Sequence, residues 1–214
     1  MTLRRSLVLG AIVTSVTIAL SACTSSDDDS SSSSQVVVKA GSPGEPNKQA
    51  KGSDVPDSMA EFNDVDQDFV EMMVPHHQQA VEMGALAKKY AKDERVVEFA
   101  ARISDTQRGE IDAMQAWLEV RKLPKAELKA TGHHAMHMQG MLTDAELAKL
   151  GELRGAAFDA FYVEKMIGHH QGALTMADEA LSEGTDAQNR VFAADVATTQ
   201  TVEIERLKGI LASL

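Results

Sequence analysis

The chain contains the stretch Phe69-Val-Glu-Met-Met-Val-Pro-His-His-Gln-Gln-Ala-Val-Glu-Met83 and repeats it 93 residues later. The second copy, Tyr162-Val-Glu-Lys-Met-Ile-Gly-His-His-Gln-Gly-Ala-Leu-Thr-Met176, aligns with the first without a gap. The same offset pairs Thr106-Gln107 with Thr199-Gln200 further along the chain. The sequence is therefore an internal duplication of a helix pair, and each copy carries a Met-x-x-His-His element.

Residues 1–22 are predicted to be the signal peptide of a lipoprotein. Arg4-Arg5 and the apolar run that ends at Leu20 are typical of an export signal. The run is followed by a sequence that resembles the bacterial lipobox, in which Cys23 is lipidated and becomes the first mature residue. Cys23 is the single cysteine, so an intrachain disulfide is excluded. We expect an exported protein, anchored through its acylated (palmitate-bearing) cysteine to the outer face of the cell membrane or its periplasmic side.

Residues 23–56 are predicted to be the lipidated cysteine and a disordered tether, because Ser, Asp, Gly, Pro and Lys dominate them. Residues 57–214 then form one domain. The whole chain carries 32 acidic and 21 basic residues, which gives a formal net charge of −11. This charge argues against nucleic acid as a partner and favours the attraction of cations.

The domain is predicted to be all-α, because aromatic residues make up 4% of the chain and proline is absent after Pro124. Two helical hairpins joined by a long crossover, from Pro124 to about Leu142, are typical of a four-helix bundle. The duplication implies a pseudo-twofold axis between the hairpins. Helices are expected over residues 64–90, 94–121, 155–181 and 186–212, with a short one after the capping box Thr143-x-x-Glu146, to residue 150.

Histidine and methionine gather on one face of each duplicated helix. At 100° per residue, Met73, His76, His77 and Met83 share an arc about 120° wide, with Ala80 between them. A single histidine on such a face is usually an ordinary core residue. Four buried imidazoles without partners would cost several kcal/mol, however, and a bound metal removes this cost. The predicted metal ligands are Met73, His76, His77 and Met83, with their second-copy equivalents Met166, His169, His170 and Met176.

The choice of metal follows from the donor atoms. Thioether sulfur with imidazole suits copper, Cu(I) above all and Cu(II) as the second choice, whereas zinc prefers cysteine or carboxylate beside histidine. The Glu-x-x-His pairs of di-iron bundles are missing. A second soft donor cluster stands in the crossover, and its alternative is a polar loop that contains histidine by chance. This cluster comprises His133, His134, Met136, His137, Met138 and Met141.

Paired polar residues are predicted to hydrogen-bond the ligands and orient them, as metal-bound imidazoles usually require. Gln107 and Gln200 interrupt the apolar stripes of their helices, and Glu110 and Glu203 follow one turn later. Solvent-facing positions near the bundle edge are an equally good reading of these four residues. The full predicted set is Asp66, Asp159, Gln107, Glu110, Gln200 and Glu203.

The segments Met73-Val-Pro-His-His-Gln78 and Met166-Ile-Gly-His-His-Gln171 resemble the domain of unknown function family numbered 305. The resemblance covers about residues 64–214 and includes Gly140-Met-Leu-Thr143 between the copies. It implies a ferritin-like helical bundle, and the CopM-type members of the family bind copper outside the cytoplasm and support copper resistance. By position it implicates the eight Met and His residues of the two copies. Lys165, where the first copy has Met72, departs from this pattern and adds a cation beside the second site.

The expected function is copper binding for buffering, transfer or resistance, with a copper-donor or copper-acceptor protein as a possible partner. No catalytic residue is predicted, because a Ser-His-Asp set, a phosphate loop and a haem-attachment motif are all missing from the sequence. Two alternatives stay open. One is a copper- or iron-dependent oxidoreductase on the same scaffold, and the other is a metal-free structural or partner-binding helical module.

Overall fold

The computed structural model describes residues 36–39, 48–51, 61–127 and 138–214, and the chain divides into two units, residues 1–55 and 56–214. In the first unit, strand β1 (Val36–Lys39) pairs antiparallel with β2 (Lys48–Lys51). Neither strand was expected in the predicted tether. The β-branched run Val36–Val38 favours extended backbone and accounts for β1. Cys23 and the predicted signal peptide lie outside the described residues.

The described part of the second unit is helical, and the predicted all-α four-helix bundle is confirmed. Each helix boundary lies within two residues of its predicted position, and the short helix after Thr143 is present as a fifth element. The helices are α1 (Asp64–Tyr90), α2 (Glu94–Val120), α3 (Asp144–Glu152), α4 (Ala156–Glu183) and α5 (Ala187–Leu211).

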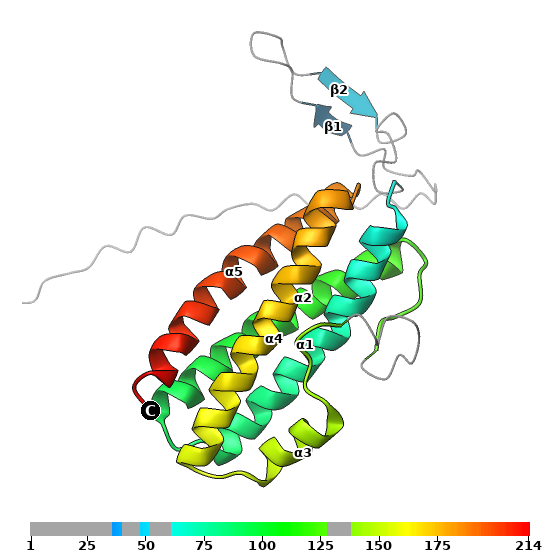
Figure 1. Cartoon of the computed structure of the whole chain (residues 1–214). Coiled ribbons are helices and arrows are strands. Elements are labelled where there is room, and N and C mark those ends of the chain that lie inside the picture. The colour runs from blue at the N-terminus through cyan, green and yellow to red at the C-terminus, as the bar shows by residue number, and fades with distance from the viewer. Residues whose placement is uncertain (1–35, 40–47, 52–60, 128–137) are drawn as a thin grey trace, which may run out of the picture. The chain divides into compact units, whose positions relative to one another are not determined.

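The two duplicated hairpins pack side by side, and their four long helices lie roughly along one common direction, as Figure 1 shows. Helix α1 packs along α2, helix α4 along α5, and the hairpins join mainly through α1 and α4. These two central helices are antiparallel: Tyr90 at the end of α1 packs against Phe158 near the start of α4. Within the described residues, none of the helices is long and apolar enough to cross a membrane.

Polar side chains define where the helices begin. Asn63, Asp93 and Asp186 each accept a hydrogen bond from a backbone N–H of the first turn that follows. The predicted capping box is confirmed, because Thr143 accepts from the N–H of Glu146 while the Glu146 carboxylate accepts from the N–H of Thr143. These caps fix the register of the helices, and so fix which side chains meet in the bundle.

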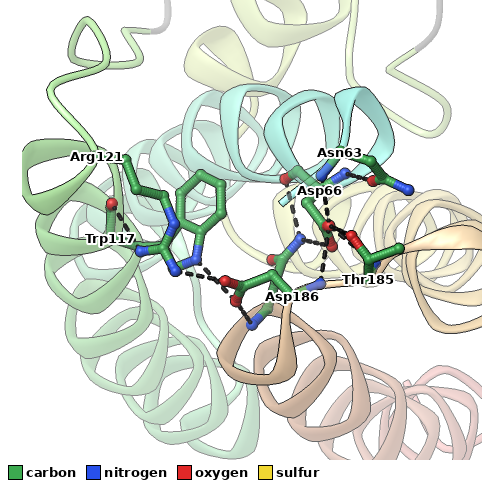
Figure 2. Close-up of polar contacts among 7 residues, drawn as sticks. Asn63, Asp66, Trp117, Arg121, Thr185 and Asp186 are labelled. Atoms are coloured by element: carbon green, nitrogen blue, oxygen red, sulfur yellow. Dashed lines mark hydrogen bonds and ion pairs between the residues drawn. The ribbon is translucent and has the colours of Figure 1, made fainter. Parts of the chain in front are cut away.

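Asp66 and Asp159 tie each hairpin to the turn of the other. The Asp66 carboxylate accepts from the N–H groups of Thr185 and Asp186, both at 2.9 Å (Figure 2). Asp159 accepts from the N–H groups of Lys92 and Asp93, at 2.9 and 3.0 Å, which are the duplicate positions. Both carboxylates therefore hydrogen-bond turns at the ends of the bundle, ten residues before the histidines of the same helix. That they orient metal ligands stays a prediction.

Asp186, whose N–H binds Asp66, also contacts the C-terminal end of α2 through its side chain. Its carboxylate accepts from the Trp117 indole N–H at 3.1 Å and also pairs with the Arg121 guanidinium (Figure 2). Arg121 in turn lies 4.1 Å from the Trp117 ring centroid, a cation–π contact. One end of α2 is thereby fixed to the start of α5, close to where Asp66 binds the same turn.

The apolar core consists of two clusters, and neither includes the duplicated histidines. One cluster contains Met73 of α1 and Met176 of α4, and the other contains Met83 of α1 and Met166 of α4. His76 and His169 lie between these methionines in the sequence of their helices. The histidines therefore form a polar layer that separates the two halves of the core.

Candidate metal centre

All four duplicated histidines are completely buried, at 0% exposure. They stand near the middle of the central helices, and the His76 and His169 ring centroids lie 3.7 Å apart at an interplanar angle of 41°. His77 and His170 follow on their own helices at 6.3 Å from these rings. The structure thus brings the two predicted histidine pairs into one layer at the junction of the hairpins.

A carboxylate contacts the second histidine of each pair. His77 Nε2 lies 2.8 Å from Glu110 Oε2, and His170 Nε2 lies 2.8 Å from Glu203 Oε2. A carboxylate accepts hydrogen bonds, so Nε2 of each ring is the donor and carries the proton. In the neutral ring this leaves the lone pair on Nδ1, and both Nδ1 atoms are buried without a hydrogen-bond partner among the described residues. Glu110 and Glu203 are thus placed to hold the rings of His77 and His170 in one orientation through these hydrogen bonds.

His76 and His169 differ from each other. His76 Nε2 donates to the Gln139 carbonyl oxygen at 3.2 Å, which again leaves the lone pair on Nδ1. For His169, both ring nitrogens lack a partner among the described residues. In total, five imidazole nitrogens of the layer are buried and unpaired. Because buried polar atoms are normally paired, this set indicates a ligand that the protein side chains themselves do not supply.

The rings at the centre of the layer are uncharged at neutral pH. Burial, reinforced by the neighbouring His77, lowers the pKa of His76 to about 3. Burial is also the main cause that holds the pKa of His169 well below its usual value, and His76 is the next cause. Neutral imidazole is the form that binds metals, so these two rings need lose no proton before they coordinate one.

Gln107 and Gln200 lie in the buried part of α2 and α5, at 1% and 2% exposure. Both polar atoms of each amide lack a partner among the described residues, so the predicted hydrogen bonds to the imidazoles are not formed. Of the four paired residues, the two glutamates contact histidine and the two glutamines do not. The amide oxygen and nitrogen atoms of Gln107 and Gln200 are therefore four more buried, unpaired polar atoms of the bundle, in addition to the five imidazole nitrogens.

The four predicted methionine donors of α1 and α4 are buried, with exposure between 0% and 4%. Because α1 and α4 are antiparallel, each core cluster combines the first methionine of one copy with the last methionine of the other. Met73 lies in one cluster with Met176, and Met83 lies in the other with Met166. Each side of the histidine layer therefore has one thioether from each copy. The structure places no predicted methionine of the helices in solvent.

Carboxylates and imidazoles alone do not make a metal site here. Across residues 61–127 and 138–214, no group of three or more His, Cys, Asp or Glu side chains is arranged to hold a metal ion. The unpaired imidazole nitrogens and the flanking thioethers together are the donor set that remains. Such a set fits a soft ion that accepts few ligands, and it does not fit a hard cation that requires several oxygens.

The crossover cluster is described in part. His133, His134, Met136 and His137 lie outside the described residues. Met138 is half-buried and packs against the cluster that contains Met73, and Met141 is also half-buried. The end of the crossover thus reaches the histidine layer, as the contact of Gln139 with His76 also shows.

Sequence reasoning missed three residues of this region. Gln79 hydrogen-bonds the backbone of Leu142, Gln139 supplies its carbonyl to His76, and Tyr162 carries a buried hydroxyl that lacks a partner among the described residues. Burial, and then the charge of Glu203, raise the pKa of Tyr162. Departures from the repeat could have identified two of them, because Gln79 aligns with glycine and Tyr162 with phenylalanine.

Known proteins are similar to this chain in sequence and in fold. The model of the family described as domain of unknown function (DUF305) matches residues 66–211. The chain is similar to a DUF305 protein from Streptomyces coelicolor that is described as secreted, at 34% identity over 70% of this chain and 91% of the other, with a TM-score of 0.64. A DUF305 fragment from Deinococcus radiodurans is 30% identical over 71% and 98% of the chains, with a TM-score of 0.65.

A third similar structure is CopM, which has been solved with Cu(II), with Cu(I) and with silver bound. The Cu(II) form is 28% identical over 69% of this chain and 96% of the other, with a TM-score of 0.59. Among curated proteins, none matches the chain.

Proposed function

The chain belongs to the DUF305 family, and from this premise we propose that it binds copper at the histidine layer and buffers or transfers it outside the cytoplasm. The observation that carries the proposal is the set of five buried imidazole nitrogens without partners. An unpaired buried polar group costs roughly 1–3 kcal/mol, so the layer is costly as it stands. A bound metal offsets this cost and explains why the layer persists in both copies.

The tautomers support the same proposal. Three of the four rings donate from Nε2, two to carboxylates and one to a carbonyl, and so present the Nδ1 lone pair. Metal-ligating histidines commonly donate their other N–H to a carboxylate or carbonyl, which fixes the ring orientation and makes the ligand more basic. Glu110 and Glu203 would hold His77 and His170 in this manner.

Copper is favoured over zinc by the thioethers on both sides of the layer. Silver, which CopM also binds, is a soft monovalent ion, and this supports Cu(I) as the oxidation state that such a donor set prefers. The relative described as secreted supports an exported protein. Lipid attachment at Cys23, a metal-donor or metal-acceptor partner and the additional role of the crossover cluster remain parts of the proposal.

The experiment that tests this function is a competitive metal titration of residues 57–214. Cu(I) is titrated under anaerobic conditions against a chromogenic chelator, with Cu(II) and Zn(II) in parallel. We expect Cu(I) to be withdrawn from the chelator and Zn(II) not to be. Selective zinc binding, or no binding of copper, contradicts the proposal. Turnover of oxygen or peroxide by the copper-loaded protein would favour the oxidoreductase alternative.

Removal of the carboxylate partners is expected to weaken copper binding by about 10- to 100-fold, the usual effect of losing such a hydrogen bond. The changes are Glu110→Ala and Glu203→Ala, and the measurement is the same chelator competition. The matched control is Glu205→Ala, which removes an exposed glutamate from α5 that pairs with Lys208. Equal affinity of the Glu203→Ala and Glu205→Ala proteins would contradict a role for Glu203.

A further inference from the structure

The segment Met138–Leu142, called the strap below, lies across the histidine layer. At one end, the Gln139 carbonyl accepts the hydrogen bond from His76 Nε2. At the other end, the Gln79 side chain holds Leu142 with two hydrogen bonds: Nε2 donates to the Leu142 carbonyl at 2.9 Å, and Oε1 accepts from the Leu142 N–H at 2.7 Å. Three hydrogen bonds to α1 therefore keep the strap in place.

On α4 the strap rests directly on the helix backbone. A Cβ atom on Gly172 would lie 1.8 Å from the Gln139 carbonyl oxygen, so only glycine allows this approach. Gly140 has φ +81°, and a Cβ there would lie 2.4 Å from the Gly168 carbonyl oxygen. No side chain separates strap and helix at these points, and the fit depends on the two glycines.

The duplication shows what the strap does to the symmetry of the site. Gln79 and Gly172 occupy equivalent positions of the two copies, so the strap runs across the pseudo-twofold axis from one copy to the other. It pairs with His76 and leaves both nitrogens of His169 unpaired. The two halves of the histidine layer are therefore inequivalent before any metal arrives.

A cleft of about 250 Å³ lies beside the strap, between α1 and α4. Gln139 lines this cleft and also contacts His76, so this one residue stands between the cleft and the imidazole. The thioethers of Met72 and Met176 line the cleft together with the carboxylate-bearing residues Asp68 and Glu179. An approaching soft cation meets sulfur and negative charge there before it meets the strap.

We propose that the strap gates metal exchange at the histidine layer, which rests on the proposed copper function. The ion enters through the cleft, and the strap must lift from Gly172 to let it pass to the free ring nitrogens, among them Nδ1 of His76. The hydrogen bond from His76 Nε2 to Gln139 opens during this passage and forms again in the closed, loaded state. The rate of loading and of release then depends on the strap, whereas the equilibrium affinity depends chiefly on the imidazoles and thioethers. Gln79 and Gly172 are positioning residues of this gate.

The test compares Gly172→Ala with Gly168→Ala. The first adds a methyl group against the strap, and the second adds the same group to the same helix where its Cβ meets no atom within 4 Å. Without metal, modification of His76 and His169 by diethyl pyrocarbonate is followed by peptide mass spectrometry. We expect at least tenfold faster modification in Gly172→Ala and wild-type rates in Gly168→Ala. Wild-type rates in Gly172→Ala overturn the gate.

Stopped-flow loading from a Cu(I)–chelator complex gives the second readout, with the same expected tenfold acceleration. Gln79→Ala removes two of the strap's hydrogen bonds without adding bulk, and it is expected to act in the same direction if Gly172→Ala fails to fold. If Gly172→Ala shows faster histidine modification but the wild-type protein binds no copper, the strap is retained as the cover of the histidine layer and the copper function is rejected. Slower or unchanged loading with intact copper binding would reject the gate alone.

Discussion

Replacing His76 and His169 together with alanine is expected to lower copper affinity by at least about 100-fold, more than loss of a ligand's hydrogen-bond partner usually costs. These rings are 3.7 Å apart and hold three of the five unpaired buried nitrogens of the layer. Chelator competition with Cu(I) measures the change. Circular dichroism should show an unchanged helical content, because the substitution also removes unpaired polar atoms from the core.

The control for this prediction is Ile103→Val, which trims a fully buried core residue and removes no donor atom. Its copper affinity should equal that of the wild type, although its stability falls by roughly 1 kcal/mol. If the double histidine variant keeps wild-type affinity, the copper site is not the histidine layer. The crossover residues His133, His134, Met136 and His137 would then be the donors to replace next.

Asp66→Ala is expected to destabilise the bundle by about 3 kcal/mol, because it leaves several donors at one buried carboxylate unpaired. These donors are the N–H groups of Thr185 and Asp186, the Asn189 side-chain amide and the N–H of Asn63 (Figure 2). Urea unfolding at pH 7 measures the loss. Asp195→Ala, which removes an exposed carboxylate of α5, is the control and should change stability by less than about 0.5 kcal/mol.

The effect of Asp66→Ala should shrink in acid. Burial by itself would raise the pKa of Asp66, but the hydrogen bonds from Asn189, Asn63, Thr185 and Asp186 outweigh burial and lower it. A carboxyl group with a lowered folded-state pKa stabilises the fold above its unfolded pKa, about 3.9, and this contribution is lost as pH falls toward the folded value. The difference in unfolding free energy between the wild type and Asp66→Ala should therefore be larger at pH 7 than at pH 3. An equal difference at both values would contradict this role of the ionised carboxylate.

Metal binding and bundle assembly are coupled by this architecture. Each hairpin contributes one histidine pair, and the rings that touch, His76 and His169, come from different hairpins. The Asp66 and Asp159 ties hold the same two hairpins together at their ends. A metal that binds between the hairpins therefore stabilises the native state by mass action, and copper should raise the thermal midpoint of the protein.

Much of the candidate site follows from the repeat. The spacing of Met73, His76 and His77 on one helical face predicted that they would be buried together, and all three have 0% exposure. For Glu110 and Glu203 the sequence left two readings open, a contact with the histidines or a solvent-facing position, and the contacts are present at 2.8 Å. Helical periodicity is a local property, so the sequence is sufficient for such inferences.

Long-range contacts do not follow from the same periodicity. Asp66 shares the arc of the histidines, yet it lies at the end of the bundle against the turn of the other hairpin. Gln107 interrupts an apolar stripe and is buried as that position implies, but its amide does not reach a ring nitrogen among the described residues. A helical wheel shows on which side of the helix a side chain lies. It does not show which residue of another helix or turn that side chain contacts.

Local sequence features account for the helices, their boundaries, the equivalence of the two copies and the residue types available for a soft metal. These depend on caps, periodicity and composition, which act over a few residues. Tertiary packing set the antiparallel arrangement of α1 and α4 and placed Met73 and Met176 in one core cluster. It also brought the strap into hydrogen-bond contact with the ring of His76 and not with the ring of His169. Such contacts arise from packing between segments about 30 to 100 residues apart, where one close approach, such as Gln139 on Gly172, depends on the shapes of both surfaces at once.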